Sequence, residues 1–394
     1  MNKLDKSALP IWQLFLYLIM IGFTFISMPK GGIFYLVARS VQALEMIFFI
    51  ALCVVFYRQG IRFNKFNTQV NIWWLFYLFI TYAFTIGVGL TPVLWWINVV
   101  IFLLLGTCYW QNNPQDSYRY IAIAFSLLIY LNAILLVLFP EGLWIDPDWV
   151  GRGDPTRHLF GNYNQIGFVC LLGISVQAMY TLSTQKGWTN LCLLVVTSLF
   201  SVIYTGSMTS AVGLSILAMY LLVHKFIKRP KIYLAAFIVV YILFFMLIVW
   251  YGNSIEEIKI ATNFIEGTLS KDTSFSYRTT IWGNAVYKIS QSPWIGYGVQ
   301  NVEWNMTYLD GSGPHNLWLM LLLQGGVSLC SAFVFIVVHI VRHALKTPGY
   351  STTLSVVSIC VVFIMSLFET YPIVPIFVLL QFVYYSPLLE TTRK

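Results

Sequence analysis

Charged residues are scarce in this chain of 394 residues, since aspartate, glutamate, lysine and arginine together make up only 10% of it. Soluble domains carry about 25% charged residues, so the shortage excludes an ordinary soluble enzyme. A hydrophobic content of 58% also excludes a disordered chain, which needs low hydrophobicity and a high charge density. The composition therefore predicts a polytopic membrane protein.

Paired cysteines and repeats are absent as well. The six cysteines form no C-x-x-C pair and all lie inside apolar stretches, so neither a disulfide framework nor a zinc site is predicted. No internal repeat or low-complexity tract is visible. We therefore expect a single transmembrane domain over residues 1–394.

Twelve apolar stretches approach the roughly 20 residues that a helix needs to cross a bilayer. Lipid offers the backbone amides no other partner, so these spans are expected to be helical. The first has a basic start like a signal peptide, but it is long for one and no small-residue cleavage site follows, which predicts an uncleaved span. The twelve stretches are residues 9–28, 36–57, 70–89, 91–110, 120–140, 165–183, 188–206, 208–224, 232–251, 316–341, 352–370 and 372–389.

An even number of spans places both termini on one side of the membrane, and the basic residues indicate which side. With the termini in the cytoplasm, the inner segments hold 15 of the 23 lysines and arginines and only three acidic residues, as the positive-inside rule expects. The net charge of +8 is therefore a topology signal, and no nucleic-acid partner is predicted. Two outer loops, residues 141–164 and 252–315, are long, and long loops often hold functional residues.

The larger outer loop, between the ninth and tenth spans, contains the segment SFSYRTTIWGNAVYKI, which predicts an amphipathic helix. Ser276 is a plausible N-cap, and Arg278 lies one turn before Trp282 on the apolar face. Such a helix on the outer membrane surface would lower Arg278 toward a central cavity. An interfacial helix whose arginine reaches lipid headgroups is an equally good interpretation of the residues alone. The apolar face consists of Ile281, Trp282, Ala285 and Ile289.

Other polar residues stand near the outer ends of spans. His315 opens the tenth span, where an imidazole can take a proton from a hydroxyl. A purely structural place at the start of the span, with Asn316 or the Ser312 region as the cap, is slightly favoured. Arg152 and Arg157 precede the sixth span; an arginine fork suits phosphate oxygens, but loop arginines near anionic lipid are common. Glu369, near the outer end of the eleventh span, could line the same cavity as His315.

Several segments, taken in order, resemble the bacterial O-antigen ligase and polymerase family, the Wzy-type polysaccharide polymerases. They are RHLFGNYNQIG, TGSMTSAVG, SYRTTIWGNAV…SPWIGYG, PHNLW…LLQGG and SLFET, and the resemblance spans about residues 150–370. It implies a GT-C-like, all-α membrane protein of about 12 helices. It also implies transfer of a glycan from undecaprenyl diphosphate to a hydroxyl acceptor, without metal or cofactor, at the outer face of the bacterial cytoplasmic membrane.

The resemblance further implies roles for individual residues. Arg278 and a first-loop arginine, Arg157 in preference to Arg152, would hold the diphosphate. His315 would activate the acceptor hydroxyl, and attack from the opposite face would invert the anomeric carbon. For the aromatic side chains of the large loop, anchoring in the membrane interface is the favoured alternative to sugar binding. The residues expected to bind substrate are Arg152, Asn162, Asn164, Tyr277, Trp282, Tyr297, Asn316 and Glu369.

The acceptor separates two variants of this function. A polymerase of O-antigen, capsule or exopolysaccharide, which we favour, uses a second lipid-linked repeat unit; a ligase uses lipid A-core oligosaccharide. Membrane lipids and a chain-length regulator are the further partners expected. The alternative from another class is a lipid-linked glycan flippase or transporter, but transporters tend to bind at the midplane between related halves, and deep charges are nearly absent here.

Overall fold

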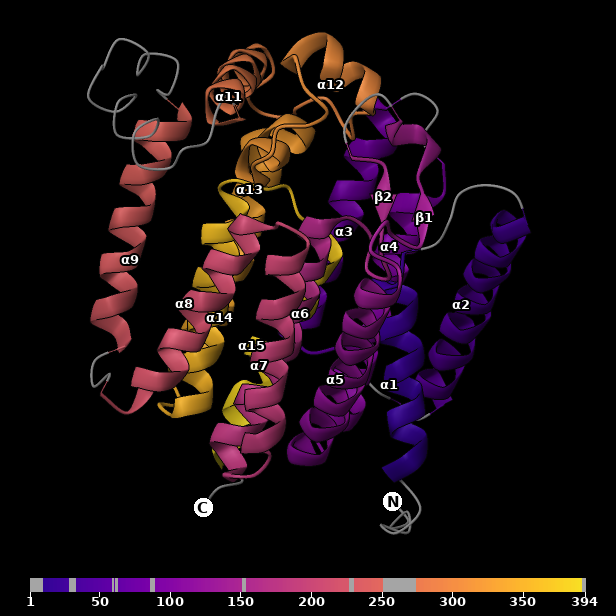
Figure 1. Ribbon diagram of the computed structural model, residues 1–394, viewed down its shortest axis with the longest axis vertical. Coiled ribbons are helices and arrows are strands. Elements are labelled where there is room, and N and C mark those ends of the chain that lie inside the picture. The colour runs from indigo at the N-terminus through magenta and orange to yellow at the C-terminus, as the bar shows by residue number, and fades with distance from the viewer. Residues whose placement is uncertain are drawn as a thin grey trace.

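The protein is described by a computed structural model that covers residues 10–27, 33–58, 60, 63–85, 89–150, 154–226, 230–250 and 274–391. These residues form fourteen α-helices and one small two-stranded sheet. Most of the helices run side by side in one bundle (Figure 1). The predicted all-α polytopic membrane fold is confirmed.

Twelve helices correspond to the twelve predicted spans. Seven are long and apolar enough to cross a membrane, namely α2, α4 with its π-helical continuation η1 (Gly106–Trp110), α5, α6, α8 with the 3-10 turn η3 (His224–Phe226), α13 and α15. Shorter apolar helices are α1, α7, α9 and α14, and α3 completes the set. Their bounds are α1 (Pro10–Phe25), α2 (Ile33–Arg58), α3 (Lys65–Phe84), α4 (Thr91–Leu105), α5 (Pro114–Leu138), α6 (Tyr163–Thr184), α7 (Trp188–Tyr204), α8 (Met208–Val223), α9 (Pro230–Phe244) with η4 (Phe245–Trp250), α13 (Leu317–Ala344), α14 (Tyr350–Ser366) and α15 (Ile373–Thr391).

Several boundaries differ from the hydropathy pattern, and two of them are informative. Helix α3 begins at Lys65, five residues before the predicted span, because the Asn64 carboxamide caps it by accepting a hydrogen bond from the Asn67 amide at 2.9 Å. Helix α14 ends at Ser366, although the predicted span continued to residue 370. Because α14 ends at Ser366, residues 367–372 form a non-helical connection between α14 and α15.

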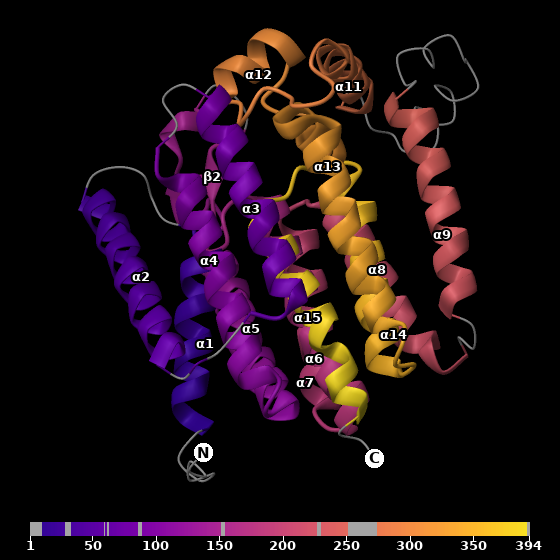
Figure 2. The same ribbon diagram turned by 180° about the vertical axis from the view of Figure 1, so that it is seen from behind.

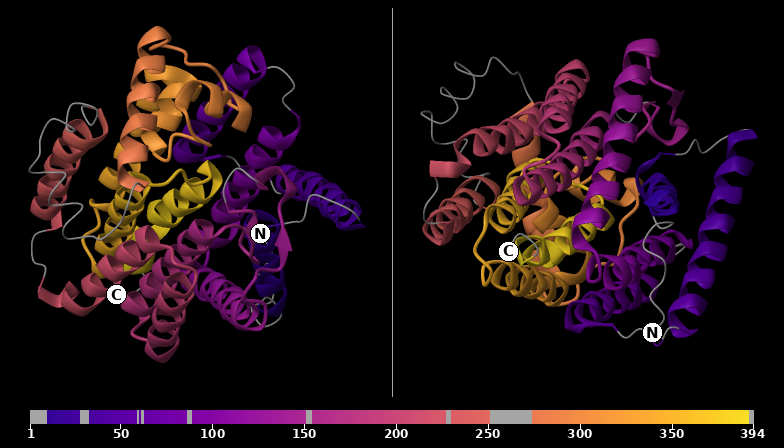
Figure 3. Two further views of the ribbon diagram at one scale, coloured as in Figure 1. Left: turned by 45° about the horizontal axis from the view of Figure 1, so that its top comes forward. Right: turned by 90° about the horizontal axis from the view of Figure 1, so that it is seen from below.

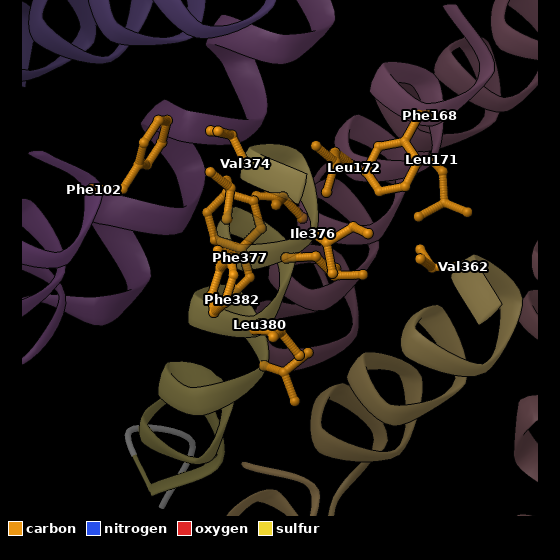
Figure 4. Packing of buried hydrophobic residues seen from close by; sticks show 14 of the residues in the cluster. Phe102, Phe168, Leu171, Leu172, Val362, Val374, Ile376, Phe377, Leu380 and Phe382 are labelled. Atoms are coloured by element: carbon orange, nitrogen blue, oxygen red, sulfur yellow. The ribbon is translucent and has the colours of Figure 1, made fainter. Parts of the chain in front are cut away.

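Helices α6 and α15 form the centre of the bundle. Both are apolar on all sides and almost wholly buried, as expected for helices surrounded by others. Figure 4 shows Phe168, Leu171 and Leu172 of α6 beside residues of α15. Seen from below, α15 lies among the other helices (Figure 3, right), whereas α2 and α9 stand at the flanks (Figures 1 and 2).

The two ends of the bundle differ. The start of α1 and the end of α15 lie at one end (Figures 1 and 2). At the opposite end lie α11 (Ser274–Gln291), α12 (Val302–Leu309) and an antiparallel pair of short strands, β1 (Trp144–Ile145) and β2 (Thr156–Arg157). We call this second end the loop end. The arrangement agrees with an even number of crossings.

Helix α13 is broken at Gly326, whose φ of 62° lies outside the helical range. A break leaves backbone groups unpaired, which is costly within a membrane. Here the turn after α11 supplies partners, because the amides of Tyr297 and Gly298 donate to carbonyls of α13 at 2.7 and 2.9 Å. In return the Val327 amide donates to the Pro293 carbonyl at 2.7 Å. The segments SPWIGYG and LLQGG therefore form one joint, the Gly326 joint, which ties α11 to α13.

Substitution Gly326→Ala is expected to destabilise the protein by about 1–3 kcal/mol, because residue 326 must keep a positive φ. An added Cβ would also lie 2.2 Å from the backbone of Trp294, where nothing can yield cheaply. Thermal unfolding of the purified protein in detergent measures the effect. Gly22→Ala is the matched control, since its Cβ would meet no atom closer than 3.6 Å. Equal melting temperatures for the two variants would contradict the joint's role.

Candidate functional site

Helix α11 lies across the loop end and presents its apolar face to the protein (Figure 1). The four predicted apolar positions are at most 4% exposed and pack with leucines of α12 and α13. The indole Nε1 of Trp282 donates to the Pro314 carbonyl at 3.0 Å, which links α11 to the segment before α13. The helix begins at Ser274, so Ser276 lies inside it and the prediction of Ser276 as the N-cap is wrong.

Arg278, Glu369 and His315 meet at the loop end, and we call them the charged cluster. The guanidinium Nη2 of Arg278 donates to the carboxylate Oε1 of Glu369 at 2.7 Å. The other carboxylate oxygen, Oε2, lies 3.7 Å from the Nδ1 atom of His315. One carboxylate thus joins a residue of α11 to a residue two positions before α13.

Glu369 lies in the connection after α14 and not within a span. It is only 6% exposed, and a buried carboxylate is costly unless it is paired. The pair with Arg278 meets this need, and Arg278 Nη1 also donates to the neighbouring carbonyl of Phe368. These contacts oppose the interpretation of Arg278 as a lipid anchor, because its guanidinium is bound by protein on two sides.

The backbone at His315 is unusual. Its φ of 45° is in the left-handed region, which a histidine rarely adopts and which is often found at functional sites. Helix capping is performed by Asn316, whose Oδ1 accepts from the amides of Trp318 and Leu319 at 2.9 and 3.1 Å. The imidazole of His315 therefore points elsewhere, with Nε2 3.5 Å from the Ser312 hydroxyl and Nδ1 toward Glu369.

Hydroxyl and amide groups from α6 and α8 lie beside the charged cluster. Tyr163, which begins α6, is close enough to be influenced by the charges of both Glu369 and Arg278. The next residue, Asn164, accepts a hydrogen bond from the Ser207 hydroxyl at 2.8 Å, at the start of α8. Ser207 and Ser210 belong to the segment TGSMTSAVG, so the start of α8 lies beside the start of α6 at this site.

Tyr371 follows Glu369 by two residues and is fully buried. Burial raises the pKa of its phenol, and the Glu369 carboxylate acts in the same direction. The phenol therefore stays neutral at physiological pH. Neither Tyr371 nor Tyr163 was predicted as a site residue, although each lies within or directly beside a segment that resembles the family.

The structure does not bring Arg157 into the charged cluster. Its side chain is buried within the first loop, with Nε 3.4 Å from the Asp146 carboxylate and the guanidinium 5.5 Å from the Trp149 ring centre. Its Nη1 donates to the carbonyls of Asp154 and Thr156 at 2.8 and 2.9 Å. These bonds fold the first loop. A diphosphate-binding role for Arg157 stays a prediction, and Arg152 lies outside the described residues.

Several of the residues expected to bind substrate use their polar groups within the protein. Asn162 forms a reciprocal capping box with Gln165 at the start of α6, at 3.0 and 3.1 Å. The Tyr297 hydroxyl donates to the Lys288 carbonyl at 2.8 Å, and Asn316 Nδ2 donates to the Leu367 carbonyl at 2.9 Å. Together with Trp282 these residues hold the loops around the cluster. Tyr277 lies on α11, but its side chain is outside the described part of the chain.

The charged cluster combines three chemical capacities. A guanidinium offers planar N–H donors to an anion, and an imidazole accepts a proton near neutral pH. The carboxylate between them lies where it can orient the imidazole and stabilise the positive charge that the imidazole gains with a proton. Such a site suits a reaction in which a hydroxyl loses a proton while an anionic group leaves.

Comparison with known families agrees with this description. Residues 193–334, a little over a third of the chain, match a family model described as O-antigen ligase (Wzy_C). The matched segment includes Arg278, His315 and both segments of the Gly326 joint, and it ends before Glu369. No curated protein matches the chain. The chain is thus similar over this segment to a family of glycosyltransferase-like membrane enzymes.

Proposed function

We propose that the protein is a glycosyltransferase that moves a glycan from undecaprenyl diphosphate to the hydroxyl group of an acceptor. The observation that supports this most is the meeting of Arg278, Glu369 and His315, from three separate elements, at one end of the bundle. By the positive-inside rule, the basic residues of the opposite end support a cytoplasmic location for that end. The loop end then faces outward from the bacterial cytoplasmic membrane, where lipid-linked glycans are used.

In the proposed reaction, the acceptor oxygen forms a bond to the anomeric carbon as the bond from that carbon to the diphosphate oxygen breaks. His315 takes the acceptor proton, and Arg278 neutralises the charge that grows on the leaving diphosphate. Glu369 holds both side chains in place. The products are the lengthened glycan and undecaprenyl diphosphate, and the anomeric carbon is inverted.

A flippase would need arginines for the same diphosphate, but it would need them along the depth of its path. The charged cluster lies instead at the loop end, and its His315–Glu369 pair is of the kind that removes a proton from an attacking hydroxyl. These two features favour transfer over transport.

The acceptor is the finer question. We propose a polymerase, with a second lipid-linked repeat unit as acceptor. The description of the matched family model, O-antigen ligase, supports lipid A-core oligosaccharide as the acceptor at least as well. Both variants use the same charged cluster, so they share one mechanism and differ in what binds opposite the donor.

One assay separates these functions. The purified protein in lipid nanodiscs is given a single undecaprenyl-diphosphate oligosaccharide, and the products are resolved by gel electrophoresis and mass spectrometry. A polymerase yields a ladder of longer glycans from this substrate alone. A ligase yields no ladder but transfers the glycan once lipid A-core is added. If no glycan is released from undecaprenyl diphosphate with both acceptors present, the proposed function is contradicted. Movement of the lipid-linked glycan across vesicle membranes would then favour a flippase.

A further inference from the structure

A cavity of about 260 Å³ lies at the loop end between α1, α4, α6 and α15. Its lining includes Trp95 and Asn98 from α4 and Gln165 and Phe168 from α6. One water occupies about 30 Å³ in the liquid, so the space is several waters large and has room for a single sugar ring. None of the described residues that line it is charged.

The polar groups of this cavity are only partly used by the protein. The Asn98 Oδ1 accepts from the Thr24 hydroxyl at 3.1 Å and its Nδ2 donates to the Leu94 carbonyl at 3.2 Å, which leaves a second amide hydrogen. Gln165 Oε1 accepts from the Asn162 amide, and its Nε2 has no partner among the described residues. The indole N–H of Trp95 likewise makes no hydrogen bond within the described part of the chain. Three amide and indole groups thus have N–H donors to spare.

A neutral sugar fits this cavity chemically. The cavity offers uncharged amide donors, a hydroxyl group and an indole ring around a small space. The hydroxyl groups of a sugar pair with amides, and its C–H faces pack on an aromatic ring. A lipid tail would not satisfy the donors, and a phosphate would find no cation among the lining residues that the structure describes.

The cavity and the charged cluster share two elements. The connection that holds Glu369 continues to Pro372, which lines the cavity, and α6 begins with Tyr163 beside the cluster and continues to Gln165 and Phe168. Phe168 of the cavity wall also packs against Tyr371, two residues after Glu369, with the ring centroids 4.8 Å apart. Figure 4 shows Phe168 of α6 and Val374 of α15, two residues of the cavity wall, within one group of packed side chains.

We propose that this cavity binds one neutral sugar ring of the glycan substrate. This ring is not the one whose bond is broken or formed in the transfer. This inference rests on the proposed transferase function, and the ring belongs to either the donor or the acceptor glycan. It predicts that Trp95 and Gln165 recognise the glycan without taking part in the chemistry.

The test uses a glycan that cannot react. The neutral oligosaccharide is released by mild acid from the lipid-linked repeat unit of the host strain, and its binding to the purified full-length protein is measured by calorimetry and saturation-transfer NMR. Trp95→Ala is expected to weaken this binding about tenfold, because the ring face and the N–H donor are both lost. Trp96→Ala is the matched control, since its indole donates to Asn71 at 3.1 Å and does not line the cavity.

A second variant guards against misfolding. Gln165→Glu keeps an oxygen that can cap α6 and replaces the Nε2 donor with a charged carboxylate oxygen. A negative charge in the first turn of a helix is favourable, so this variant should weaken binding while the melting temperature stays near that of the wild type. In the transfer assay, a KM increase confined to the donor or to the acceptor assigns the ring to that glycan.

The outcomes for the two proposals are distinguishable. Oligosaccharide binding that depends on Trp95, in a protein without transfer activity, supports the sugar site and contradicts the transferase. Transfer activity combined with equal binding by wild type and Trp95→Ala overturns the sugar site alone. Absence of any oligosaccharide binding by the wild type also overturns it.

Discussion

Replacing His315 with asparagine is expected to reduce the rate of glycan transfer by about 10²- to 10⁴-fold, the range over which a positioned general base contributes. Asparagine tolerates a positive φ as well as histidine does, so the backbone at 45° can persist. It cannot accept a proton near neutral pH. The loss should therefore appear in kcat, with little change in KM for the lipid-linked donor.

The control for this variant lies on α13, the helix that follows His315. His339 of α13 is in the half of the helix far from the loop end, and His339→Asn should leave transfer unchanged. A melting temperature near that of the wild type would show that His315→Asn is folded. Normal transfer by such a folded protein would remove His315 from the mechanism.

Replacing Glu369 with glutamine is expected to lower kcat by roughly 100-fold, because both Arg278 and His315 lose the charge that orients them. Glutamine has a similar shape and still accepts one hydrogen bond, so packing should be kept. Arg278 is partly exposed, so water can solvate it and the loss of stability should be small. The readout that identifies a positioning residue is the split between kcat and KM in the transfer assay.

Two further variants sharpen this prediction. Glu369→Asp retains the negative charge on a side chain that is shorter by one methylene group. It should therefore be more active than Glu369→Gln. Glu303→Gln changes an exposed carboxylate on α12, at the same end of the molecule, and should have no effect. If Glu369→Gln turned over like the wild type, Glu369 would be a structural partner of Arg278 and nothing more.

The parts of this site that depend on residues close together in the sequence could be predicted, because helical periodicity and hydropathy are patterns of neighbouring residues. The spacing of Ile281, Trp282 and Ala285 predicts a buried helix face, and the structure confirms that face and the place of Arg278 on it. His315 was predicted at the mouth of a span because the apolar stretch begins there, and α13 does begin two residues later.

Contacts between distant segments were not predictable. Arg278 and Glu369 are 91 residues apart, and a hydropathy pattern contains no register between separate helices. Glu369 was placed near the end of a span because the apolar stretch runs on to Phe368, whereas the helix ends at Ser366. In the first loop, the missing contact information led to a residue being predicted as a ligand. Arg157 resembles an anion ligand in sequence, but the structure shows that its guanidinium is paired with the Asp146 carboxylate.

The most direct test of the charged cluster is an electron cryomicroscopy structure of the His315→Asn protein with an undecaprenyl-diphosphate oligosaccharide, which that variant should hold without consuming. The proposed mechanism predicts that the diphosphate lies within hydrogen-bond distance of the Arg278 guanidinium, with the anomeric carbon facing residue 315. A diphosphate bound beside Arg157 or elsewhere, with Arg278 still closed on Glu369 alone, would contradict it.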